Sequence, residues 1–393
     1  MFVIGKFIVG FGGAIGATAT APLLAELAYP THRPIFTAVY NTTWYVGSIV
    51  AAWVTYGTFK MPNSWSWRIP SILQGVVSVI QLTCIYLVPE SPRWLIANNQ
   101  AETATRILCK YHAGTEEPND LVRFEVAEIT AALQFERAQR STSYLQFFRT
   151  RGNRHRLLIA TLLGFMIQWC GNGLISYYLA LILTSIGIDD PKTQNIINGV
   201  LQIFNLMVAV MAACLVDRLG RRFLFLLSTA GMMVSFIIWT AISARNEQQN
   251  FESKSLGIGV VTMVFIFFAF YNLAMMPLPI TYLVEILPYT LRAKGIAVFN
   301  FSQLSSAIFN GFVNPIAMER ISWKYYIVYV CAIGLWLVVI FFGFPETRGL
   351  SLESVSRVFD DEDWQHQADE KTKPGQEASP KVQDVWIDEV SKQ

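Results

Sequence analysis

Long apolar runs alternate with polar connections along most of this chain. Each run is close to or above the roughly 20 apolar residues that a helix needs to cross the hydrocarbon core of a bilayer. The runs are continuous rather than alternating with a period of two, which favours membrane-spanning helices over a β-barrel. The pattern predicts an all-α membrane protein with nine spans, at roughly 1–28, 37–58, 68–88, 157–185, 194–216, 223–243, 256–281, 295–318 and 325–345.

Composition supports this interpretation and excludes several other classes. The chain is 53% hydrophobic and 15% charged, whereas soluble domains are about 45–50% apolar and about 25% charged. A net charge of +2 argues against nucleic-acid binding, and five cysteines, most of them inside apolar runs, argue against a disulfide scaffold. The segment from Glu353 onward is polar and acidic, which is typical of a disordered tail.

Two charged signatures occur twice. Segment 26–33 (Glu-Leu-Ala-Tyr-Pro-Thr-His-Arg) is echoed by 285–292, and segment 89–93 (Pro-Glu-Ser-Pro-Arg) is echoed by 345–349. The two offsets are nearly equal, 259 and 256 residues, which indicates duplicated halves. Internal repeats of this kind are typical of secondary transporters.

A third signature, Asp-Arg-Leu-Gly-Arg-Arg at 217–222, has no counterpart in this sequence. Its partner would lie before residue 1, and the first half has three predicted spans where the second has six. We therefore expect that this chain has nine of twelve helices and lacks the first three. An authentic nine-span protein is the alternative.

With these motifs in order, the chain resembles the sugar porter family of the major facilitator superfamily over about residues 1–352. Segments 168–178 and 271–279 are most similar to fungal lactose permease-like and hexose transporters. The resemblance implies the major facilitator fold, in which two helical bundles surround a central site and a cytoplasmic helical loop joins them. The implied domains are the remaining half of the N-terminal bundle (1–88), the cytoplasmic loop (89–156), the C-terminal six-helix bundle (157–345) and a cytoplasmic polar tail (346–393).

The positive-inside rule does not settle the orientation of the spans. Lys and Arg favour the side of the long loop, but that excess disappears when the loop and the tail are left out, because the rule is weak for long segments. The motifs place the loop and the C-terminus in the cytoplasm.

The long loop contains one apolar stripe on an otherwise charged segment. Val122, Val126, Ile129 and Leu133 recur at helical spacing. We expect a helix that packs on the undersides of the spans, in preference to a helix that binds a partner.

Charged residues gather at the predicted cytoplasmic ends of the spans. Such charges are costly beside a bilayer unless they are paired or hydrated, and Arg can pair bidentately with a carboxylate. By resemblance they form a gate network that latches the two bundles when the site faces outward; the alternative is that they only end helices and fix topology. The residues are Glu26, Arg33, Glu90, Arg93, Asp217, Arg221, Arg222, Glu285, Arg292, Glu346 and Arg348.

Amides and aromatic side chains within the spans are the candidate sugar contacts. Sugar hydroxyls both donate and accept hydrogen bonds, so their site needs amide partners and aromatic surface. The candidates are Asn41, Gln168, Asn172, Tyr177, Tyr178, Asn205, Asn272 and Gln303. By resemblance, Gln168, Asn205 and the tyrosine pair occupy recognised positions. The alternative for each amide is an ordinary interhelical hydrogen bond, worth about 0.6 kcal/mol.

Three positions depart from the family pattern. Ile167 replaces the first Gln of a usual pair, Gly173 replaces an Asn, and Ile280 stands where many relatives have Trp. Asn172 offers an amide one residue before Gly173, which would compensate for that loss. The departures leave the class of substrate intact and the particular sugar open.

The predicted function is secondary transport of a mono- or disaccharide by alternating access. The resemblance adds proton symport if the protein is longer, because the coupling acid of proton-driven porters lies in the first span. We expect no enzyme activity, no metal and no cofactor; the partners are the sugar, protons and the lipid bilayer. The expected form is a monomer in the plasma membrane. The alternatives are a non-transporting sugar sensor and an inactive truncated fragment.

Overall fold

The structure is a computed structural model. It describes residues 2–29, 33–115, 117–138, 143–184, 186–249, 254–348, 355 and 359. Within these ranges, some side chains are not described; they belong to residues 2, 17, 18, 21, 22, 25, 33–39, 41, 42, 135–138, 213–218, 254 and 289. The described residues form helices and their connections, without a strand.

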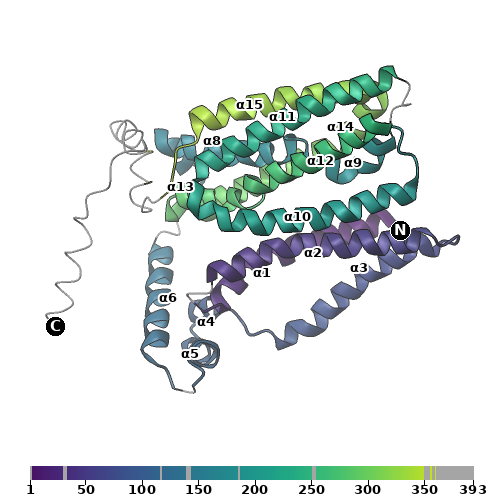
Figure 1. Cartoon of the computed structure of the whole chain (residues 1–393). Helices are drawn as coiled ribbons and strands as arrows, with labels where there is room; N and C mark the ends of the chain where they lie inside the picture. The colour runs from purple at the N-terminus through teal and green to yellow at the C-terminus, as the bar shows by residue number, and fades with distance from the viewer. Residues whose placement is uncertain are drawn as a thin grey trace.

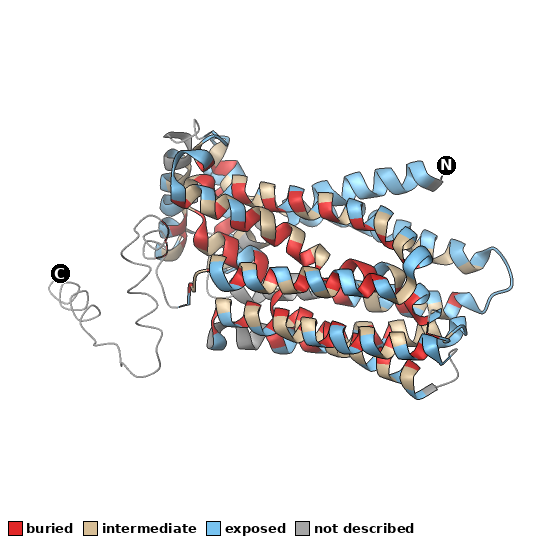
Figure 2. Cartoon of the chain, turned by 90° about the horizontal axis from the view of Figure 1, so that it is seen from above, coloured by how far each residue is buried: buried red, intermediate tan, exposed pale blue. Residues whose placement is uncertain are grey.

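Three N-terminal helices form one side of the molecule (Figure 1). They are α1 (Phe2–Leu27), α2 (Arg33–Phe59) and α3 (Trp65–Cys84), and a 3-10 turn (Ile85–Leu87) follows α3. Helix α2 packs against α10, where a Cβ at Gly199 would lie 3.2 Å from the ring of Trp53. Helix α3 has no buried residue, and Figure 2 shows the first turns of the N-terminal helix as exposed.

Short helices follow at one end of the bundle, which we call the loop end. They are α4 (Pro92–Ala97), α5 (Ala101–Leu108), a π-helical segment (Cys109–Ala113), α6 (Asp120–Ala138) and α7 (Gln146–Arg149). The predicted stripe does lie on a helix, α6. Its partners are Leu95 and Ala104 of α4 and α5, and Leu108 just before the π-helical segment. The expectation that the stripe packs on the undersides of the spans is therefore wrong, because the loop helices bury it among themselves.

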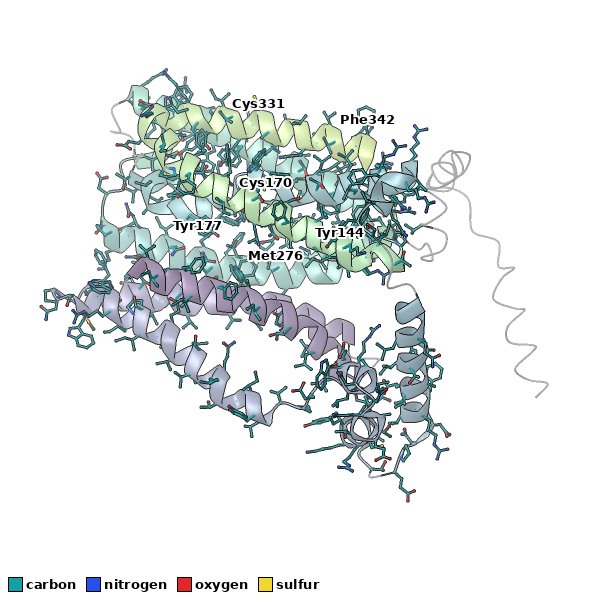
Figure 3. All side chains as sticks on the ribbon, turned by 180° about the vertical axis from the view of Figure 1, so that it is seen from behind. Tyr144, Cys170, Tyr177, Met276, Cys331 and Phe342 are labelled. Carbon is teal, nitrogen blue, oxygen red and sulfur yellow. The ribbon has the colours of Figure 1, made fainter. Side chains whose placement is uncertain are left out.

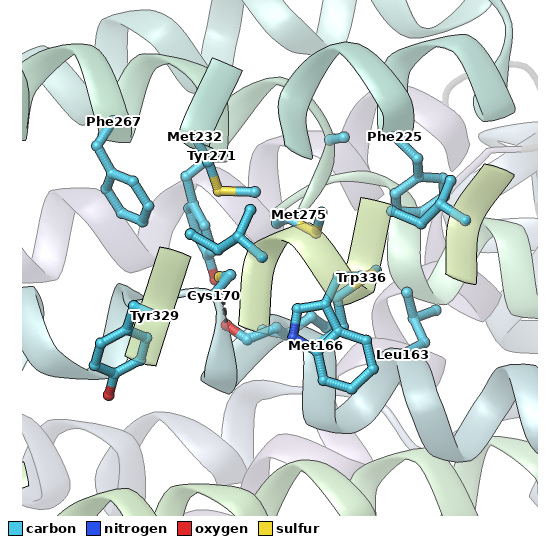
Figure 4. Packing of buried hydrophobic residues seen from close by; sticks show 14 of the residues in the cluster. Leu163, Met166, Cys170, Phe225, Met232, Phe267, Tyr271, Met275, Tyr329 and Trp336 are labelled. Carbon is cyan, nitrogen blue, oxygen red and sulfur yellow. Dashed lines mark hydrogen bonds between the residues drawn. The ribbon is translucent and has the colours of Figure 1, made fainter. Parts of the chain in front are cut away.

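The C-terminal part contains a contiguous apolar core. Trp239, Phe236 and Phe267 are fully buried, and their rings pack at tilted or edge-on angles. Figure 4 shows part of this core. The helices that enclose it are α8 (Arg151–Trp169), α9 (Asn172–Thr184), α10 (Pro191–Leu219), α11 (Arg221–Gln248), α12 (Lys254–Ala274), α13 (Leu278–Ile286), α14 (Tyr289–Ile321) and α15 (Tyr325–Gly343), with a 3-10 turn (Ser322–Lys324) before the last.

Two of the predicted spans are broken in the middle. The stretch 157–185 is divided between α8 and α9 at Gly171, whose φ is +101° and whose Cβ would lie 2.5 Å from the Phe236 ring. The stretch 256–281 is divided between α12 and α13 next to Pro277, where proline removes a helical N–H donor. Figure 3 shows Cys170 and Met276, one from each break, near mid-length of the bundle. Broken helices of this kind line the substrate sites of many transporters.

The opposite end of the bundle contains a well-defined helix start. The carboxylate of Asp190 accepts hydrogen bonds from the hydroxyl and the N–H of Thr193 and from the N–H of Lys192, at the first turn of α10. The hydroxyl of Thr193 and these N–H groups hold the pKa of Asp190 below its ordinary value.

Six stretches of the described chain are long and apolar enough to cross a membrane. The last of them contains both α14 and α15, and α1 contributes only a shorter apolar segment, Val3–Gly16. The all-helical prediction is confirmed, whereas the count of nine spans stays a prediction. The stretches are Trp65–Leu87, Arg151–Thr184, Pro191–Ala212, Arg221–Gln248, Ser255–Ile286 and Thr290–Gly343.

Candidate functional site

A chain of three polar side chains joins α2 to the C-terminal helices. The hydroxyl of Tyr45 on α2 donates to Asn272 Oδ1 on α12, at 2.5 Å. The amide nitrogen of Asn272 in turn donates to Asn205 Oδ1 on α10, at 3.2 Å. The three side chains are almost inaccessible, with exposed fractions of 5% for Tyr45, 0% for Asn272 and 1% for Asn205. Two of the predicted sugar contacts therefore meet, together with a tyrosine that the sequence interpretation missed. We call these three residues the central triad.

A second polar group surrounds the break between α8 and α9. Asn310 on α14 donates from Nδ2 to the backbone carbonyl of Gln168, at 2.9 Å. A Cβ at Gly173 would lie 3.0 Å from Asn310 Nδ2 and 3.5 Å from Gln168 Oε1. The side-chain oxygen Gln168 Oε1 is buried and has no hydrogen-bond partner among the described atoms, so it can accept from a substrate hydroxyl.

Asn310 thus supplies an amide beside Gly173, and the compensating role of Asn172 stays a prediction. Asn172 Oδ1 accepts from the hydroxyl of Ser176 in its own helix, at 3.0 Å. The signal for Asn310 was present in the sequence: Ser302, Ser306, Asn310 and Asn314 recur every four residues and are all buried on α14.

The remaining candidates lie in different surroundings. Tyr178, where α9 is kinked, donates to the carbonyl of Gly311 on α14 at 3.0 Å, which ties the two helices together. Tyr177 is 69% exposed. Gln303 is partly buried on α14, and its backbone nitrogen lies 2.9 Å from where a Cβ of Gly164 would be. The side chain of Asn41 lies outside the described residues.

At the loop end, the carboxylate of Glu346 caps the start of α11. It accepts from the backbone N–H of Arg221 at 2.9 Å and of Arg222 at 3.0 Å. The first N–H groups of a helix lack helical partners and favour negative charge. The turn before them requires Gly220, whose φ is +91° and whose Cβ would lie 3.0 Å from Glu346 Oε2.

The Arg221 side chain extends this arrangement to α13. Its guanidinium lies 3.1 Å from Glu285 Oε1, and the other oxygen of Glu285 accepts from the hydroxyl of Thr347 at 2.6 Å. One charge network therefore joins the start of α11, the end of α13 and the segment after α15. Arg222 Nη2 donates to the carbonyl of Phe341 at 2.7 Å.

The charged residues of the first half are arranged differently. Glu26 at the end of α1 accepts from the hydroxyl of Ser91, which also caps α4. Glu90 is exposed and Arg93 is partly buried. In the second half, Arg292 is partly buried, and exposed Arg348 donates its backbone N–H to Glu346 at 3.0 Å. The side chains of Arg33 and Asp217 lie outside the described residues.

Residues 1–359 match the sugar (and other) transporter family. The chain belongs to the sugar porter family of the major facilitator superfamily. The resemblance drawn from the motifs is thereby confirmed, and so is the prediction that this is not an enzyme, since the homologues are transporters.

Three relatives of this sugar porter come from the fungi Aspergillus, Saccharomyces and Kluyveromyces. It is 29% identical to the MFS-type transporter criB of Aspergillus cristatus over 94% of this chain and 75% of that protein. It is 30% identical to the sugar transporter STL1 of Saccharomyces cerevisiae, over 91% of this chain and 62% of that protein. It is 29% identical to hexose transporter 2 of Kluyveromyces lactis, over 92% of this chain and 64% of that protein. The chain therefore spans between 62% and 75% of the length of these three relatives.

Solved structures confirm the fold of the sugar porter. The inward-open xylose transporter XylE from E. coli superposes with a TM-score of 0.72 at 21% identity, over 91% of this chain and 72% of that chain. The proton:xylose symporter XylE bound to 6-bromo-6-deoxy-D-glucose superposes with a TM-score of 0.71 at 22% identity, over 91% of this chain and 74% of that chain. The major facilitator fold is therefore shown.

The sugar porter also has a buried link at the loop end that the sequence did not reveal. His112 Nδ1 lies 2.7 Å from Glu125 Oε2 on α6, and its Nε2 lies 3.3 Å from the carbonyl of Leu27 at the end of α1. The ring also meets Tyr29 edge-on. In the sequence His112 was one of four scattered histidines, because its partners lie in two other segments.

A second such link joins α8 to the segment that follows α15. Arg156 is buried; it donates from Nε to the carbonyl of Ile286 at 2.9 Å and lies 4.7 Å from the centre of the Phe359 ring. His155 Nε2 lies 2.9 Å from the carbonyl of Gly343. These contacts hold the loop ends of α8, α13 and α15 together.

Proposed function

We propose that this protein moves a mono- or disaccharide across the membrane by alternating access. The observation that carries the proposal is the central triad, which places amide and hydroxyl groups between α2 and the C-terminal helices in a member of a sugar transporter family. These groups are neutral and supply both donors and acceptors, as a neutral polyhydroxylated substrate requires.

The second polar group extends the proposed site. Gln168 Oε1 offers a buried acceptor next to the break between α8 and α9. Within the proposal, Gln168, Asn205 and Asn272 contact the sugar directly. Asn41, Asn172, Tyr177, Tyr178 and Gln303 remain candidates by resemblance.

Proton-driven members of the family have a coupling acid in their first span. For a form of this protein that contains such an acid, the proposed mode of transport is symport of sugar with protons. XylE is described as a proton:xylose symporter, and fungal transporters are among the relatives of this chain. The proposed location is the plasma membrane, with the loop and the C-terminus in the cytoplasm, and the proposed form is a monomer. The charge network around Glu346 and Glu285 then belongs to the cytoplasmic gate, as do Glu26 and Arg33 in the first half.

Transport is tested by sugar uptake in a yeast strain without its own sugar transporters. The full chain, and a form extended at its N-terminus by upstream coding sequence, are expressed and their surface levels measured. Labelled xylose, glucose and lactose are then offered while the external pH is recorded. We expect saturable uptake of at least one sugar. Normal surface expression of both forms without uptake of any sugar would contradict transport and favour a sensor. Equal uptake by both forms would show that the additional segment is not needed.

A further inference from the structure

The central triad joins helices that lie far apart in the sequence. Tyr45 and Asn272 are separated by 227 residues, and Asn272 and Asn205 by 67. Because the three side chains are buried, no water replaces a partner that moves away. Separation of α2 from α12 at this point is therefore disfavoured unless another donor and acceptor take the place of Tyr45.

We propose that the Tyr45–Asn272 hydrogen bond is a clasp between the two halves that a substrate hydroxyl opens by insertion. The proposal rests on the sugar-transport function proposed above and adds a positioning role for Tyr45. A hydroxyl can donate to Asn272 Oδ1 while it accepts from the Tyr45 hydroxyl, so one inserted group satisfies both partners.

The geometry of Asn272 also specifies the class of substrate. Its carboxamide uses its oxygen toward Tyr45 and its nitrogen toward Asn205, and the second of these bonds is the longer. A second hydroxyl can accept from Asn272 Nδ2 while it donates to Asn205 Oδ1. The two groups of one carboxamide are adjacent, so the fitting ligand has two neighbouring hydroxyls. The triad is thus a receptor for a vicinal diol.

The clasp explains how binding would lead to motion. In the empty protein the Tyr45–Asn272 bond holds α2 against α12. When a diol occupies the triad, the carboxamide keeps its partners without Tyr45, and α2 is released from direct contact. Tyr45 therefore acts through Asn272, and its loss should alter the balance between conformations more than it alters the affinity for sugar.

The test uses Tyr45→Phe, which removes one hydroxyl and keeps the ring. The matched control is Tyr56→Phe on the same helix, whose ring contacts Trp53 and lies 5.4 Å from Lys60 Nζ, outside the triad. Spin labels on the exposed residues Trp44 of α2 and Ile280 of α13 report the distance between the halves in the purified full chain. In the native protein we expect glucose or xylose to shift the distance distribution.

In Tyr45→Phe the shifted population should rise about fivefold without sugar, the change expected for one neutral hydrogen bond, while Tyr56→Phe behaves like the native protein. The Tyr45→Phe effect should vanish in the Asn272→Leu background, because the bond is already absent there. An empty-state distribution of Tyr45→Phe that matches those of the native protein and Tyr56→Phe would overturn the clasp. This comparison needs no substrate, so it decides the clasp even if sugar transport itself fails.

The diol is tested with monodeoxyglucoses. We expect two neighbouring hydroxyls whose removal weakens binding to the native protein by about two- to tenfold each and has no effect in Asn272→Leu. Losses that are equal in both proteins would contradict the assignment of the diol to Asn272.

Discussion

The two parts of this molecule both contain long apolar helices but are packed very differently. Helix α3 buries none of its residues, and α1 is exposed from residue 3 to residue 16. The C-terminal helices, by contrast, enclose a continuous aromatic core (Figure 2). In a bilayer the lipid is as apolar as a leucine side chain, so hydrophobicity does not reveal which helix faces are packed. Packing is revealed by close contacts and by buried polar groups.

Helix α2 shows this distinction most clearly, because it belongs to the exposed part and carries buried residues. Tyr45 and Ala52 are buried there, and Trp53 packs on Gly199 of α10. The first part is therefore joined to the core along one face of α2, and the central triad is the polar portion of that junction.

The largest expected difference concerns tryptophan in the two parts. Trp239 is fully buried between Phe236 and Tyr326, so Trp239→Ala should lower the free energy of unfolding by about 3–5 kcal/mol. Trp67 on α3 is 55% exposed, and Trp67→Ala should change that free energy by less than about 0.5 kcal/mol. Thermal unfolding of the detergent-solubilised protein measures both. Similar losses in the two variants would show that the exposed part has a core after all.

The repeated motif offers a smaller and better matched comparison. Glu346 accepts four backbone N–H groups, whereas its counterpart Glu90 is exposed. Glu346→Gln should destabilise the protein by about 2 kcal/mol, since hydrogen bonds to charged groups contribute about 1.5–3 kcal/mol. Glu90→Gln should leave the free energy of unfolding almost unchanged. Thermal unfolding of the two variants measures this difference. Equal destabilisation by Glu346→Gln and Glu90→Gln would contradict the proposed difference between the two halves.

The smallest expected effect concerns the loop helices. His112→Ala removes the link from the π-helical segment to Glu125 and to the end of α1, at a cost of about 1 kcal/mol. We expect amide hydrogen exchange to become faster in α5 and α6 while α11 and α12 are unchanged. The control is Lys110→Ala, an exposed position in the same segment. Unchanged exchange in His112→Ala would show that the link does not hold the loop in place.

Most of the long helices could be predicted from the sequence, because continuous apolar runs correspond to α10, α11, α14 and α15 with boundaries that differ by no more than six residues. The two breaks could not. A hydropathy pattern does not report the positive φ at Gly171 or the ring of Phe236 beside it. The stretch 256–281 was predicted as one continuous span, although it contains Pro277 and Pro279.

The candidate site was predicted by residue type rather than by geometry. Asn205 and Asn272 were chosen as amides within apolar helices, and the structure brings them together. Tyr45 and Asn310 were missed because their partners lie more than 100 residues away, and an aromatic or amide on one helix does not indicate which other helix it faces. The charges of the predicted gate network were identified by motif. Their pairing, such as Glu346 with the start of α11, depends on a turn that only the structure shows.

The central claim is that a sugar binds at the triad between α2, α10 and α12. Its most direct test is saturation binding of labelled xylose and glucose to the purified full chain, native and with Asn205→Ala. The control is Asn246→Ala, another buried asparagine, which bonds to the carbonyl of Ile186 away from the triad. We predict that Asn205→Ala weakens binding about tenfold or more while Asn246→Ala binds like the native protein. Unchanged binding in Asn205→Ala, or equal losses in both variants, would contradict the account.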